Sequence, residues 1–184
     1  MEEAMQYRRV RVPGGCYFFT AVTHQRHKLF TNDVTIGLLR QAFRRVMNKY
    51  PFSIDAIVVL PDHLHCIWTL PAGDSDFVTR WRLIKTYVTQ GVSDYGASHL
   101  IRPTGKGDAR KTIWQHRYWE HVISSGADFR AHVDYIHYNP GRHQYVNRPA
   151  DWAWSSFGVY VRRGILENDW GTSEILLPES VGHE

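Results

Sequence analysis

Residues 54–70 form one long, largely apolar run with the turn pair Pro61-Asp62 near its middle. Each half of the run has about the length of an ordinary β-strand, and the break between them is short enough to be a tight turn. We therefore predict two antiparallel strands, 54–60 and 65–70, paired as a hairpin. Any fold proposed for this chain has to be built around that hairpin.

The segments on either side of the hairpin alternate between strand and helix patterns. A β-rich stretch follows the turn signal Gly14-Gly15, and three stretches have helical spacing of their apolar residues. The predicted elements are a strand at 16–23, a helix at 34–50, a helix at 74–92, a strand at 118–123 and a helix from 127 to about 139. The order β-α-β-β-α-β-α is that of a ferredoxin-like α+β sandwich, with one antiparallel sheet and helices on one face.

Local signals set the expected ends of these elements. Asn32 or Asp33 can cap the start of the first helix, and Pro140-Gly141 should stop the third. Residues 96–111 read as a long loop rich in glycine and basic residues. Cys16 and Cys66 lie in strand-like segments without C-x-x-C spacing, so we expect two buried free thiols.

Composition indicates a folded protein, and its basic balance favours a polyanionic partner without proving one. Hydrophobic residues make up 43% of the chain, aromatic residues 14%, and the formal net charge is +4. No apolar stretch reaches membrane-spanning length and no signal peptide is recognisable, so we expect a cytoplasmic protein. Basic residues gather in four clusters interleaved with aromatic side chains, which favours nucleic acid. The clusters are Arg8-Arg9-Arg11, Arg44-Arg45, Arg80-Arg82-Lys85 and Arg102-Lys106-Arg110-Lys111.

His63 and His65 stand at the start of the second strand of the hairpin. Alternate side chains of a strand share a face, so the two imidazoles point the same way and Cys66 points away. Two adjacent imidazoles make half of a metal site, although two polar residues near a turn would give the same pattern.

The predicted third helix supplies the groups that would complete such a site. Its core stripe is Phe129, Val133 and Ile136. A second, polar stripe with spacing i, i+4, i+7, i+11 lies beside it and consists of Asp128, His132, Tyr135 and Asn139, whereas Tyr138 falls on the far side.

Combining the hairpin and the helix gives a candidate catalytic centre. His63, His65 and the side-chain oxygen of Asn139 form a mixed nitrogen and oxygen ligand set, which suits Mg²⁺ or Mn²⁺ and leaves positions open for a phosphate. Tyr135 is then the nucleophile, because it shares the polar stripe with a ligand.

These residues resemble the HUH single-tyrosine transposases of the IS200-like family, and most of all their REP-associated branch. The matching blocks are 15–20, 59–68, 113–121, 132–140 and 151–157. The resemblance implies that His63, His65 and Asn139 bind the metal, that Tyr135 is the nucleophile and that Asp62 is a turn or supporting residue. Gly141 departs from the family pattern, which usually has an apolar residue after Asn-Pro.

The resemblance also implies a substrate and an assembly. The substrate is single-stranded DNA carrying a palindromic hairpin, cut to leave a 5′-phosphotyrosine and a free 3′-hydroxyl, by a monomer located at the nucleoid. The candidate DNA contacts are Arg8, Arg9, Arg11, Arg82 and Lys85. Residues 1–141 would form the catalytic domain, and 142–184 a tail with three tryptophans that packs on or near the active site.

Three alternatives remain open from the sequence. An RRM-like module that binds nucleic acid without catalysis has the same βαββαβ order. A metal-dependent hydrolase would use water instead of Tyr135 as the nucleophile. A rolling-circle replication initiator would use the same tyrosine chemistry.

Overall fold

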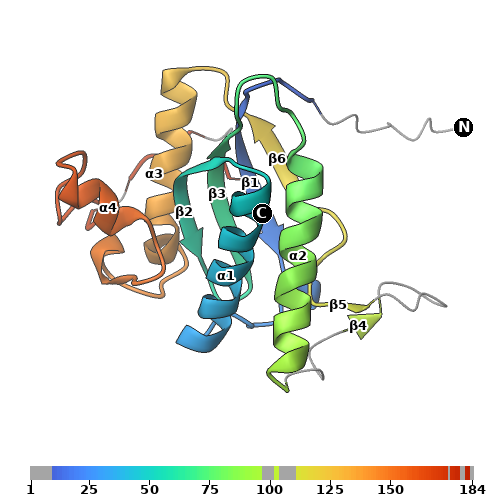
Figure 1. The fold of residues 1–184 in the computed structure, drawn as a ribbon. Helices are drawn as coiled ribbons and strands as arrows, with labels where there is room; N and C mark the ends of the chain where they lie inside the picture. The colour runs from blue at the N-terminus through green and yellow to red at the C-terminus, as the bar shows by residue number, and fades with distance from the viewer. Residues whose placement is uncertain (1–9, 97–101, 104–110, 174, 179–180, 183–184) are drawn as a thin grey trace, which may run out of the picture.

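The computed structural model describes residues 10–96, 102–103, 111–173, 175–178 and 181–182. Its main sheet has four strands in the order β2-β3-β1-β6, and every neighbouring pair is antiparallel (Figure 1). The strands are β1 (Cys16–Val22), β2 (Ser53–Val59), β3 (His63–Thr69) and β6 (Trp119–Val122). The predicted α+β fold and the predicted β2–β3 hairpin are therefore confirmed, with the turn at Pro61-Asp62 closed by a 2.8 Å bond from the Leu60 amide to the His63 carbonyl.

Helices cover both faces of this sheet. The two helices of the βαββαβ order, α1 (Asp33–Lys49) and α2 (Phe77–Asp94), lie on one face as predicted. The third helix, α3 (Gly126–Arg142), lies on the other face with Phe18 and Ile67, so the expected placement of the helices on one face holds for α1 and α2 but not for α3. This separation follows from strand alternation, because consecutive side chains of β1 enter opposite cores.

Side-chain caps explain where the helices begin. The Asn32 side chain accepts hydrogen bonds from the amides of Val34 and Thr35 at the start of α1, and Asp76 accepts one from Thr79 in α2. The structure changes the interpretation of Arg80, which the sequence analysis placed in a basic cluster favouring nucleic acid. Arg80 is buried and bonds to Asp74 at 2.6 Å, so it is part of the core and not of a basic surface.

The third helix is longer than predicted. It passes through Pro140 and ends at Arg142, so the prediction that Pro140-Gly141 stops it is wrong. A proline removes its own amide bond and crowds the carbonyl of residue i−4, but here both effects are confined to the last turn of the helix. The amide of His143 still donates to the carbonyl of Asn139 at 3.0 Å, which holds that turn together.

Two smaller expectations also change. The predicted loop 96–111 contains a two-residue ladder, β4 (Arg102–Pro103) with β5 (Lys111–Thr112), and its other residues beyond Gly96 lie outside the described ones. Both cysteines are free thiols, but only Cys66 is buried, because Cys16 stands at the open end of β1 and is partly exposed.

Residues after α3 return to the sheet. They include the short helices η3 (Pro149–Asp151) and α4 (Phe157–Arg162). A further short helix, η1 (His24–Arg26), belongs to the turn that follows β1. The amide of Val59 donates to the Trp154 carbonyl at 2.9 Å, and the Ser156 amide donates to the Ile57 carbonyl at 2.8 Å, so residues 154–156 run along β2. Among the described helices, none is long and apolar enough to cross a lipid bilayer.

Candidate active site

The histidine pair lies on the face of the sheet that α3 covers. The ring centroids of His63 and His65 are 4.9 Å apart, and both side chains are buried. In each ring Nδ1 is held by a neighbour. The Nδ1 of His63 is 2.6 Å from Asp62 Oδ1, and the Nδ1 of His65 is 2.8 Å from Thr20 Oγ1. Such a bond at one nitrogen fixes the ring so that the other can face a cation.

The Asp62 carboxylate is itself supported. Burial alone would raise the pKa of Asp62, but hydrogen bonds from His63 and Arg26 outweigh it and lower that pKa. Arg26 Nη1 lies 3.2 Å from Asp62 Oδ2. Gln25 and Arg26 have φ of 52° and 51°, a left-handed pair that is costly for residues with a Cβ. The turn after β1 therefore accepts backbone strain while Arg26 contacts the carboxylate that orients His63.

Tyr135 comes from α3 and meets the histidines from above the sheet. Its ring centroid lies 5.1 Å from that of His65 and 5.9 Å from that of Phe18. The guanidinium carbon of Arg142, two turns later, lies 5.4 Å from the same ring centroid. The structure thus brings together the predicted nucleophile and one predicted ligand, from elements far apart in sequence.

Asn139 and His143 continue the same side of α3 toward its C-terminus. Asn139 is fully buried, one turn beyond Tyr135. The ring of His143, a residue outside the predicted site, lies 5.3 Å from that of His63. Its signal was present in the sequence, because His143 is at i+4 from Asn139, but ending the helix at Pro140 removed it from the stripe.

The end of the chain lies against the tyrosine. Val181 is buried in the same cluster as Phe18 and Tyr135. Gly182 has φ of +88°, and a Cβ built at that position would overlap the ring of Tyr135. Only glycine fits there, and the phenol ring is fully buried in this arrangement.

A comparison with protein families decides what this arrangement belongs to. The family profile described as "Transposase IS200 like" matches residues 12–139, which include the histidine pair, Tyr135 and Asn139. The chain belongs to the IS200-like transposase family. As a member of that family it is an enzyme, a tyrosine transposase.

Two individual proteins match a larger part of the chain than the family profile does. The chain is 42% identical over 166 residues to a REP-associated tyrosine transposase of Escherichia coli strain K12, covering 90% of each protein. It also resembles a solved structure of a REP-associated tyrosine transposase bound to a REP hairpin, with 40% identity and a TM-score of 0.80. That likeness covers 100% of this chain and 98% of the other.

The predicted DNA contacts of this transposase are scattered in the structure. Arg8 and Arg9 lie outside the described residues, and Arg11 is exposed before β1. Arg82 and Lys85 stand on α2, which covers the face of the sheet opposite the histidines. Lys85 Nζ donates to the Gln115 carbonyl at 3.0 Å. Arg82 and Lys85 therefore lie apart from the histidine and tyrosine cluster.

Proposed function

We propose that this transposase cuts and rejoins single-stranded DNA beside a palindromic hairpin through a phosphotyrosine at Tyr135. The observation that carries the proposal is the 5.1 Å separation between the rings of Tyr135 and His65, which lets one phosphate reach both. The choice of DNA is supported by the structural relative, which was solved with a REP hairpin.

The donor set fits a divalent cation of the Mg²⁺ or Mn²⁺ class. His63 and His65 would present Nε2, with Nδ1 donating to Asp62 and Thr20, and the buried amide of Asn139 would add an oxygen. Such a cation supplies Lewis-acid polarisation of the scissile phosphate when it is bound.

The residues of the chain perform the transfer itself. The oxygen of Tyr135 attacks phosphorus and gives its proton to water. The bond from phosphorus to the 3′-oxygen breaks, and that oxygen takes a proton from water and is released as a hydroxyl. The guanidinium of Arg142 lies near the Tyr135 ring, where it would place a positive charge beside the reacting groups. A phenolate is a better leaving group than an alkoxide, so a DNA 3′-hydroxyl can reverse the step and rejoin strands without added energy.

The same proposal covers DNA binding and assembly. The hairpin would be held through phosphate contacts from Arg8, Arg9, Arg11, Arg82 and Lys85, with exposed bases stacked on aromatic rings. We propose a monomer that acts at the nucleoid, with residues 142–184 as a tail that packs against the catalytic domain 1–141.

A labelled-strand experiment tests the chemistry. A hairpin oligonucleotide with a 3′-label should move with the protein on a denaturing gel in the presence of Mn²⁺, whereas a 5′-label should yield a shorter free strand. Tyr135→Phe should abolish both products, and Tyr138→Phe, on the far side of the same helix, should keep them.

Each alternative function predicts a different result in this experiment. Hairpin binding without any cut strand would favour an RRM-like module. Cut strands without the covalent adduct would favour a hydrolase that uses water. Cleavage that requires a double-stranded replication origin would favour a rolling-circle initiator.

A further inference from the structure

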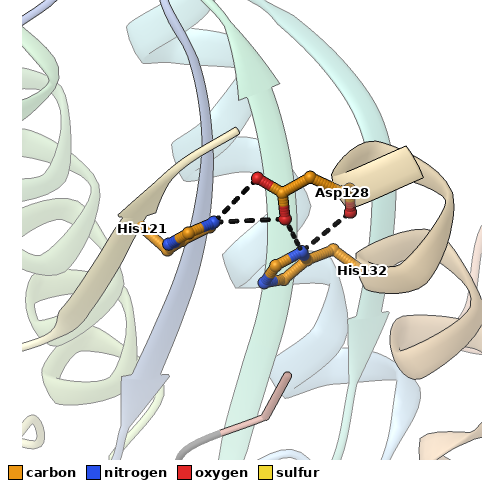
Figure 2. A group of neighbouring side chains, drawn as sticks. All are labelled: His121, Asp128 and His132. Atoms are coloured by element: carbon orange, nitrogen blue, oxygen red, sulfur yellow. Dashed lines mark hydrogen bonds and ion pairs between the residues drawn. The ribbon is translucent and has the colours of Figure 1, made fainter. Parts of the chain in front are cut away.

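A second group of titratable side chains lies where β6 meets the first turns of α3. His121 on β6 and Asp128 and His132 on α3 place their ring nitrogens and carboxylate oxygens within 4.8 Å of one another (Figure 2). His121 Nε2 is 3.0 Å from Asp128 Oδ2, and His132 Nδ1 is 2.9 Å from Asp128 Oδ1. Nothing in the chemistry proposed for Tyr135 uses these three groups.

The carboxylate of this group is rigidly held and ionised. Asp128 Oδ2 accepts hydrogen bonds from the amide of Ser124 at 2.8 Å and from its hydroxyl at 2.9 Å. Burial alone would raise the pKa of Asp128, but the bonds from Ser124 and His121 lower it to about 2. A carboxylate oriented by neighbouring donors resembles the supported ligands of metal sites.

His132 supplies a buried imidazole. Its Nδ1 lies between two acceptors, the Asp128 carboxylate and the Asp128 carbonyl at 2.9 Å, so it carries the ring proton in this state. Its Nε2 is buried and has no hydrogen-bond partner among the described residues. Burial lowers the pKa of His132, which favours the neutral ring that metals bind.

His121 gives the group its access to solvent. Its side chain is 37% exposed, and its ring stacks on that of His132 with centroids 4.7 Å apart. The two rings are inclined by only 16°, so the partly exposed His121 has to turn to direct its nitrogen at a shared ion. That rotation gives up the stacking of the His121 ring on Trp119 and His132.

We propose that His121, Asp128 and His132 bind a divalent transition-metal cation of the Zn²⁺ class, separate from the cation at His63 and His65. Two imidazole nitrogens and one carboxylate are a common three-ligand set for such ions, with water completing the shell. Binding through Nδ1 moves the ring proton of His132 to Nε2, so the imidazole stays neutral. His132 Nδ1 and His121 Nε2 lie 2.9 and 3.2 Å from the same oxygen, Asp128 Oδ1, and neighbouring ligands of a tetrahedral ion are about 3.4 Å apart at bond lengths of about 2.1 Å, so small shifts bring these donors to one ion.

Such an ion would connect β6 to the helix that carries Tyr135. The ring of Phe18 lies 4.7 Å from that of His132 and 5.9 Å from that of Tyr135. An ion that fixes His132 therefore also fixes one wall of the space around Tyr135. This role is structural and involves no contact with the reacting phosphate.

The test measures Zn²⁺ binding in a variant that lacks the imidazoles of His63 and His65, so that binding at the second group can be seen alone. In the full-length His63→Ala/His65→Ala variant, we expect one equivalent of Zn²⁺ by equilibrium dialysis. We also expect a Tm increase of roughly 5–10 °C when free Zn²⁺ is about 100-fold above its Kd. Adding His121→Ala should abolish both effects. The matched control is His116→Ala, an exposed histidine outside the group, which should leave them unchanged.

Two further measurements exclude other outcomes. Asp128→Asn in the same background should lose the bound equivalent while the circular dichroism spectrum stays that of a folded chain. Co²⁺ should give visible d–d bands without a thiolate charge-transfer band, since no cysteine belongs to the group. No Zn²⁺ bound to the double variant, or binding that persists after His121→Ala, would overturn the proposal. Loss of DNA cleavage alone leaves these readouts unaffected, so a failure here is distinct from a failure at Tyr135.

Discussion

The imidazole of His143, at the C-terminal cap of α3, lies 5.3 Å from the imidazole of His63 at the start of β3. The end of the tyrosine helix thus meets the histidine strand at the point where the predicted cation would sit. This contact exists because α3 continues through Pro140 and carries His143 back over the sheet.

His143→Ala should raise the concentration of Mn²⁺ that cleavage requires. The substitution removes a ring that packs against a predicted ligand, and losing such support typically costs about 10–100-fold in metal affinity or activity. The measurement is the Mn²⁺ concentration that gives half-maximal cleavage of a hairpin oligonucleotide. His116→Ala is the control, and an unchanged Mn²⁺ dependence in His143→Ala would show that the contact is only packing.

Asp62→Asn should act through His63. The asparagine keeps the size of the side chain but loses the charge that accepts the proton of His63 Nδ1, so we expect about 10–100-fold weaker cleavage with hairpin affinity retained. Cleavage rate and gel-shift affinity measured on the same preparation separate the two effects. Equal losses in both would place Asp62 in DNA binding instead.

Stability at low pH should depend on Asp128. Because its folded pKa of about 2 is below the ordinary value, its contribution is present above roughly pH 4 and is lost as the pH falls toward 2. The stability difference between the wild type and Asp128→Asn, from urea unfolding, should therefore shrink over that range. Asp134→Asn is an informative control, since burial raises the pKa of Asp134 and the trend should have the opposite sign. A difference that stays constant with pH would refute the assignment.

Deleting residues 179–184 should increase cleavage. That short deletion removes Val181 and Gly182, which cover the ring of Tyr135, and leaves the contacts of residues 152–160 in place. Deletion after Gly141 should instead lower the Tm, because it also removes the hydrogen bonds between residues 154–156 and β2. The initial rate of adduct formation checks the first expectation, and a rate equal to that of the wild type would contradict it.

Arg80→Ala should destabilise the fold without a specific effect on DNA. The buried guanidinium pairs with Asp74 and also donates to the Tyr50 and Pro51 carbonyls, and breaking a buried pair typically costs about 3–5 kcal/mol. Arg82→Ala, exposed on the same helix, should stay within about 0.5 kcal/mol of the wild type. Urea unfolding measures both, and similar values for the two variants would contradict the burial argument.

Local patterns in the sequence were enough to predict the sheet and the shared face of the histidines. Strand alternation set the direction of His63 and His65, and helical spacing set Tyr135 beside Asn139. The length of α3 was not predicted, because the expectation that proline ends a helix rests on that residue alone. Whether the helix continues is decided by how its last turn packs. The burial of Arg80 was missed for a related reason, since its partner Asp74 and the carbonyls it reaches come together only in the folded chain.

The hydrogen bonds from residues 154–156 to β2 have a consequence for self-association. An outermost strand with open amides and carbonyls can recruit a strand from a second molecule and begin aggregation. In this protein the returning chain occupies those groups at Ile57 and Val59, so strand addition at this border would first have to displace it.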